Sequence, residues 1–110
     1  MTESSKPSPK DGDDSKVLCR TPTPDKQPKR IDQWKFDAVR TAILDVLKSS
    51  PELPFQDLPD RVGRALGSDD RANLGSLGWY TTTVKLELEV RGEIERVPDV
   101  TPQRLRLAET

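Results

Sequence analysis

Residues 78–97, GWYTTTVKLELEVRGEIERV, contain a central run that fits two different periodicities. In steps of two, apolar and charged side chains alternate over 84–90, which is the pattern of a half-buried strand. In helical steps, one face instead gathers Leu77, Thr81, Val84 and Leu88. On this second interpretation Gly92 stands where a glycine commonly ends a helix. The choice between strand and helix decides the fold.

The segment that follows Gly92 favours the helix. Short apolar stretches around Ile94 and Leu105 flank the turn-rich sequence PDVTP, so this part of the chain predicts a hairpin. A strand in place of the helix would need a tight turn at Gly92, yet two-residue hairpin signals such as Asn-Gly are missing there. We therefore expect a helix over about 77–91.

A first helix is expected from Ile31 to Ser50, immediately ahead of Pro51. Asp32 is a candidate N-cap, and apolar residues recur at steps of three and four positions, as on an amphipathic helix. These residues are Phe36, Val39, Ile43, Val46 and Leu47.

A second helix is expected from about Asp57 to Leu66. Asp57 can cap it, and Pro59 falls in its first turn, where the missing N–H does no harm. Gly67 follows its end. Residues 68–76 are expected to be a polar connector with room for one helical turn.

The expected order is helix, helix, connector, helix and two-stranded hairpin. It predicts an α+β domain of the winged helix-turn-helix type over residues 31–110, with three helices and a C-terminal wing of two strands. Residues 1–16 are dense in Ser, Pro, Lys and Asp and are expected to form a disordered tail. Residues 17–30 are expected to be an extended linker. Within it, the apolar island 17–19 is either incidental or a short strand that docks on the domain.

Composition narrows the classes of function. The chain has 110 residues, one cysteine and no histidine. Without histidine it lacks the commonest general base and metal ligand, which excludes catalytic triads, zinc fingers and most hydrolytic metal sites. Cys19 has no partner for an internal disulfide, and no glycine spacing matches a phosphate-binding loop. We expect a protein that is not an enzyme and takes no cofactor or metal.

The distribution of apolar residues bears on location. No apolar run approaches the ~20 residues needed to cross a bilayer, and the N-terminus has no hydrophobic signal core. We therefore expect a cytoplasmic protein with no membrane partner.

The chain also resembles known sequences. Residues 88–96, LEVRGEIER, are similar to the join between recognition helix and wing in many bacterial winged-helix regulators. The fragments VLC, RID, AIL, LGSLGWYTTTVKLELEVRGEIERV and PQRLR resemble a family of small uncharacterised bacterial proteins with a winged-helix-like domain. The resemblance covers about Val17 to Leu107 and implies a fold rather than an activity. Glu93 departs from the usual apolar residue of such joins, so we expect its side chain to face solvent.

The first functional hypothesis is binding to duplex DNA. In winged helices the third helix enters the major groove and the wing follows the DNA backbone. Hydroxyl groups near the start of that helix can contact phosphates, and a lysine can contact a phosphate or a guanine. By position, the candidate nucleic-acid-binding residues are Ser76, Tyr80, Thr81, Thr82, Lys85, Arg96, Arg104 and Arg106.

The charge balance weakens the DNA hypothesis. Residues 31–110 contain 11 Lys and Arg against 14 Asp and Glu, a net charge of −3, whereas residues 1–30 contain 7 against 5, a net of +2. Because released counterions supply much of the affinity for DNA, a DNA-binding domain normally has a basic footprint. Here any such footprint must be local, and Glu87 and Glu89 on the same helix would repel phosphate.

The second hypothesis is a protein-interaction module, with a homodimer as one form of it. The side of the 77–91 helix opposite its core face gathers Trp79, Thr83, Leu86 and Val90. A helix that is apolar on two sides is usually sandwiched between other elements. The cover could be the 17–19 segment, the wing or another subunit. Because Trp is a common anchor at interfaces, Trp79 matters most if the cover is a partner.

Overall fold

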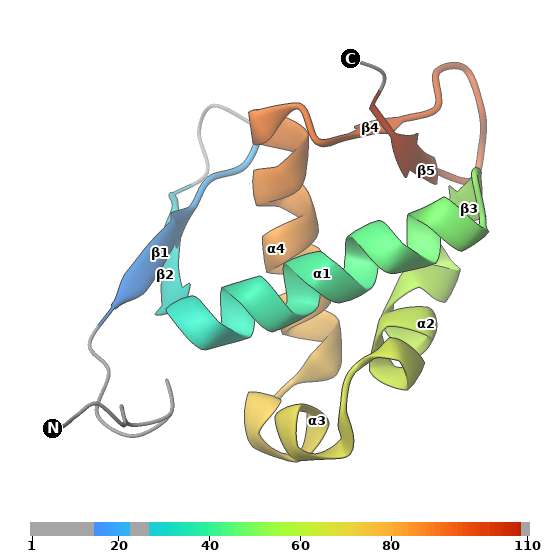
Figure 1. Ribbon diagram of the computed structural model, residues 1–110. Helices are drawn as coiled ribbons and strands as arrows, with labels where there is room; N and C mark the ends of the chain where they lie inside the picture. The colour runs from blue at the N-terminus through green and yellow to red at the C-terminus, as the bar shows by residue number, and fades with distance from the viewer. Residues whose placement is uncertain (1–14, 23–26, 109–110) are drawn as a thin grey trace, which may run out of the picture.

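The computed structural model describes residues 15–22 and 27–108. Within these ranges the protein is a mixed α+β structure with four α-helices and two small antiparallel sheets (Figure 1). The disordered tail expected over 1–16 lies, up to residue 14, outside the described residues.

An N-terminal β-hairpin precedes the first helix. β1 (Lys16–Cys19) pairs antiparallel with β2 (Lys29–Asp32), and Val17 lies opposite Ile31. Because side chains alternate across a strand, Val17 and Cys19 face the core while Leu18 is exposed. The segment 17–30, which we expected to be an extended linker, therefore begins and ends in a β-strand.

Helix α1 (Gln33–Ser49) begins two residues later than expected, because Ile31 and Asp32 belong to β2. Asp32 is the N-cap residue, but its side chain makes no capping hydrogen bond. The buried face of α1 contains the residues predicted from helical spacing, namely Phe36, Val39, Ile43, Val46 and Leu47.

The connector expected over 68–76 is largely helical, which makes the number of helices in the described part four rather than three. α2 (Leu58–Ala65) follows a short 3-10 turn and is succeeded by α3 (Ser68–Leu74). Leu74 is the buried residue of α3. The acidic side chains in its first turn stabilise the helix, because negative charge interacts favourably with the N-terminal end of the helix dipole. One apolar anchor is too weak a periodic signal to reveal a helix of this length.

Helix α4 (Leu77–Arg91) has the expected bounds. The Ser76 side chain accepts a hydrogen bond from the backbone N–H of Trp79, which caps the helix start. At the other end Gly92 adopts a left-handed conformation with φ 78°, and its N–H donates to the carbonyl of Glu89. The helical interpretation of this segment is confirmed.

The C-terminal hairpin is present as β4 (Ile94–Arg96) and β5 (Arg104–Leu107), which pair antiparallel. A third strand, β3 (Leu53–Pro54), lies between α1 and α2 in sequence and pairs with β5. The strand order is β3-β5-β4. Figure 1 shows this sheet at one end of α1 and the β1–β2 hairpin at the other.

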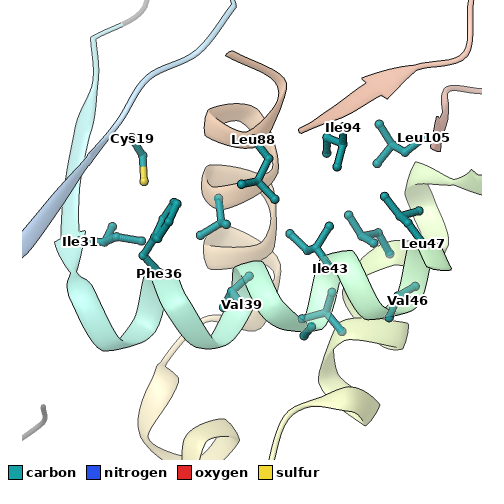
Figure 2. Packing of buried hydrophobic residues seen from close by; sticks show 14 of the residues in the cluster. Cys19, Ile31, Phe36, Val39, Ile43, Val46, Leu47, Leu88, Ile94 and Leu105 are labelled. Carbon is teal, nitrogen blue, oxygen red and sulfur yellow. The ribbon is translucent and has the colours of Figure 1, made fainter. Parts of the chain in front are cut away.

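One apolar core joins both sheets to the helices. In Figure 2, Cys19 and Ile31 of the N-terminal hairpin lie near Phe36 of α1, while Ile94 and Leu105 lie at the other end of the cluster. From α4, Val84 and Leu88 are fully buried in it. The core face expected for this helix is therefore confirmed.

Candidate interaction surface on helix α4

Glu87 joins α4 to the N-terminal hairpin. Its side chain is 1% exposed. One carboxylate oxygen accepts hydrogen bonds from the backbone N–H and the Nε of Arg20, at 2.7 and 3.1 Å. The other accepts from Nη2 of Arg20 at 2.8 Å and from Nε of Arg91 at 2.7 Å. Glu87 is thus buried and saturated with donors, whereas we expected it to repel phosphate from the helix surface.

The environment of Glu87 keeps its carboxylate ionised. Burial by itself would raise the pKa of Glu87, but the hydrogen bonds from Arg20 and Arg91 outweigh burial and hold the pKa at about 2. The pKa of the neighbouring Cys19 shifts upward, in contrast to that of Glu87. Burial, aided by the charge of Glu87, raises the pKa of the Cys19 thiol to about 11. Cys19 is therefore a protonated core residue at neutral pH rather than a nucleophile.

Lys85 is also buried, which corrects its expected place on the DNA-facing surface. Its side chain is 3% exposed, and its ammonium group forms an ion pair with Glu89. The same ammonium lies 4.7 Å from the centroid of the Phe55 ring. Burial lowers the pKa of Lys85, and the contact with Glu89 opposes that change. In this position Lys85 cannot reach a phosphate or a guanine edge.

The other candidates near the start of α4 have structural contacts. Ser76 caps the helix. Tyr80 packs edge-on against Trp79 and its hydroxyl accepts a hydrogen bond from Lys35. Thr81 is fully buried, as its place on the core face predicts, which corrects its candidacy as a DNA contact, and Thr82 is half-buried.

Two of the three wing arginines are ion-paired. Nε of Arg96 lies 2.8 Å from Glu89, and Nε of Arg106 lies 2.5 Å from Glu95. Arg104 forms no ion pair with any described residue. Glu93 is only half-buried and pairs with Arg40 at 2.7 Å. The structure therefore brings wing cations together with carboxylates rather than with the start of α4.

The outer face of α4, defined as Trp79, Thr83, Leu86 and Val90, is covered in its middle and open at its ends. Trp79 is 44% exposed and Val90 is 36% exposed. Between them, Thr83 is buried and Leu86 half-buried. Both line a slot of about 290 Å³ against the end of β1. The N-terminal hairpin therefore covers the centre of this face, and the described residues leave both of its ends exposed.

Sequence reasoning did not identify the contact between Arg20 and Glu87. The pairs Glu87–Arg91 and Lys85–Glu89 have the four-residue spacing of helical ion pairs and could have been inferred. Arg20 lies 67 positions from Glu87, and no local pattern links the two. The one available signal was the position of Arg20 directly after the apolar island.

The described ranges also bear on metal binding and on membrane insertion. No group of three His, Cys, Asp or Glu side chains there is arranged to hold a metal ion. None of the helices in the same ranges has the length and apolar character needed to cross a membrane.

Comparison with known proteins places this small α+β domain in a family. The chain belongs to the family of unknown function DUF6958, whose model matches residues 16–105. The match begins at the first residue of β1 and ends inside β5, so it includes the N-terminal hairpin. No curated protein and no solved structure matches the chain at a significant level.

Proposed function

We propose that residues 16–107 form a winged-helix domain with an added N-terminal hairpin, and that this domain binds a protein partner through the outer face of α4. The order of elements supports the winged-helix class. A strand between the first two helices pairs with the last strand, and the final helix leads through Gly92 into the wing. In that class α4 has the position of the recognition helix.

The observation that carries the proposal is the polarity of α4. The charged side chains Lys85 and Glu87 are buried, whereas Trp79 and Val90 are exposed. A helix that enters a DNA groove presents cations and hydrogen-bonding groups to phosphates and base edges. The exposed part of α4 instead presents the indole of Trp79, a residue type enriched at protein interfaces, together with Val90 and the ion-paired Arg91.

DNA binding is the second candidate, and the arginines of the wing are the observation in its favour. Arg104 has no ion-pair partner among the described residues, and the Arg96 side chain is 48% exposed. A phosphate would have to compete with Glu89 for Arg96 and with Glu95 for Arg106. This competition makes the wing a weaker anion site than its arginine content suggests.

Site-specific photo-crosslinking tests the proposal. A photoreactive phenylalanine analogue is placed at Trp79 or at Val90, and at the exposed Arg64 of α2 as a control, in full-length protein inside cells that express it. We expect a protein adduct of one mass from both positions on α4 and none from Arg64. Equal labelling at all three positions would contradict the proposal. Sedimentation of wild type and Trp79→Ala then shows whether the adduct is a second copy of the chain.

A direct titration tests the DNA candidate. Fluorescence anisotropy with a labelled duplex at about 50 mM salt, where electrostatic binding is strong, should detect no saturable binding. If binding does occur, Arg104→Ala combined with Arg106→Ala should weaken it and reduce its salt dependence. That pair of results would establish DNA binding in place of the protein interaction.

A further inference from the structure

The slot between β1 and α4 specifies the chemistry of a partner. Its lining residues are Cys19, Arg20, Thr21, Gln27, Lys29, Thr83 and Leu86. We infer that the slot binds an acidic segment of a protein partner, with one apolar side chain inserted beside Leu86 and carboxylates against Lys29 and Arg20. This inference rests on the proposed function, because it names the partner of the same face of α4.

The apolar part of the slot fits a side chain rather than a cofactor. Leu86 is half-buried, and Cys19 is a protonated, apolar neighbour. The volume of about 290 Å³ is at the lower limit of the ~300–1,000 Å³ typical of small-molecule sites. Val90 lies about 6 Å along the helix from Leu86 and extends the apolar surface beyond the slot. An inserted side chain would therefore continue onto exposed apolar surface.

The charges around the slot are positive. Arg20 and Lys29 line it, and its described lining residues include no Asp or Glu. Within the described residues, Lys29 forms no ion pair and is exposed. The Arg20 side chain is 52% exposed although it binds Glu87, and that carboxylate is shared with Arg91. The positive charge is therefore only partly neutralised, which is complementary to an acidic partner.

The same features disfavour duplex DNA as the occupant. Proteins that bind DNA with useful affinity typically neutralise about 6–10 phosphates. Among the described residues the slot is lined by two cations, Arg20 and Lys29, beside apolar surface. A phosphate backbone has no apolar side chain to insert next to Leu86, whereas an acidic peptide with a leucine or phenylalanine satisfies both the charge and the apolar surface.

Amide chemical-shift mapping of the full chain tests this inference. The probe is a short synthetic peptide with a leucine pair between aspartates. One control peptide has serine in place of the leucines, and another has lysine in place of the aspartates. We expect the acidic apolar peptide alone, at about millimolar concentration, to shift the amides of Lys29, Thr83 and Leu86. No shift of these amides would overturn the inference.

Matched variants locate the binding. Lys29→Glu should raise the Kd of the peptide at least about fivefold, because an attractive charge contact becomes repulsive. Leu86→Ser should weaken it by a similar factor, and each variant keeps the wild-type spectrum elsewhere. Arg64→Glu, which reverses an exposed charge on α2, should leave the affinity unchanged. Equal loss with Lys29→Glu and Arg64→Glu would mean a non-specific charge effect and would overturn the inference.

Two other occupants give distinct results. If the chain's own acidic residues Asp11, Asp13 and Asp14 occupy the slot, replacing all three with asparagine should tighten peptide binding, and the assignment to a partner would be wrong. Displacement of the peptide by an equimolar DNA duplex would also overturn it. Crosslinking at Val90 is independent of this probe, so a protein adduct there with no peptide binding would refute the acidic partner and leave the proposed function intact.

Discussion

The inner and outer sides of α4 differ in an unusual way. The inner side buries two charged residues, Lys85 and Glu87, beside the apolar core residues Val84 and Leu88, and the outer side exposes Trp79 and Val90. Ordinary amphipathic helices place charges in water and apolar groups in the core. Glu87 connects α4 to the N-terminal hairpin through Arg20, whereas Lys85 pairs with Glu89 of α4 itself and lies against the Phe55 ring. On the outer side, Trp79 packs against Tyr80 of the same helix, and both Trp79 and Val90 are exposed among the described residues.

The largest expected effect comes from the inner side. Glu87→Ala should lower the free energy of unfolding by about 3 kcal/mol or more, because it removes the partner of Arg20 and Arg91 and leaves a cavity. Asp60→Ala is the control, since it breaks the exposed pair with Arg64 and should cost less than about 0.5 kcal/mol. Urea denaturation followed by circular dichroism measures both. Equal losses would mean that burial adds nothing to the Glu87 contact.

Acid pH should reduce the contribution of Glu87. Its folded pKa of about 2 lies below the ordinary value of 4.5, so the ionised contact stabilises the fold fully above about pH 4.5. This stabilisation, roughly 1–3 kcal/mol given that Arg20 is half exposed, is lost as the pH falls through 2. The difference in unfolding free energy between wild type and Glu87→Gln should therefore narrow from pH 5 towards pH 2. A difference that stays constant over this range would contradict the assignment.

The second buried pair should have a smaller effect. Lys85→Met should cost about 1–2 kcal/mol, because Glu89 keeps Arg96 as a partner but loses its buried cation. The double variant Lys85→Met with Glu89→Gln should recover much of that loss, since no unpaired buried charge remains. Additive losses in the double variant would show that the two side chains act independently.

The smallest effect is expected on the outer side. Val90→Ala should change the unfolding free energy by less than about 0.5 kcal/mol, whereas Val84→Ala, the same substitution in the core, should cost about 2 kcal/mol. Thermal denaturation compares the two variants. In the crosslinking experiment Val90→Ala should have the larger effect of the two. With the photoreactive probe at Trp79, the Val90→Ala variant should lose the adduct. A large loss of stability from Val90→Ala would show that the outer face is part of the fold.

Much of the architecture could be predicted from local patterns. The bounds of α4, its glycine cap and the C-terminal hairpin follow from residues within a few positions of one another. α3 was not predicted, because Leu74 is its single buried residue and one apolar position gives no helical periodicity. β2 was not predicted because its residues were assigned to the linker and the first turn of α1. Both failures concern short elements that tertiary contacts stabilise more than their own sequence does.

The candidate site was predicted less well than the fold. Trp79, Leu86 and Val90 were placed correctly on the face of α4 away from the core, because helical periodicity determines which side chains share a face. Lys85 was placed wrongly, since a charged side chain in a sequence is ordinarily exposed. Nothing near Lys85 in the sequence indicates that Phe55 and Arg96, from other elements, surround it and Glu89.

The sequence alone therefore determined that α4 is a helix with two apolar sides, because its period and its glycine cap are local properties of the chain. The tertiary structure decided which charges are buried and which apolar groups remain exposed. The reason is that the burial of Glu87 depends on Arg20, which reaches it only when the N-terminal hairpin folds against α4. That long-range contact also forms the slot beside Leu86 and sets the part of the outer face that stays open to a partner.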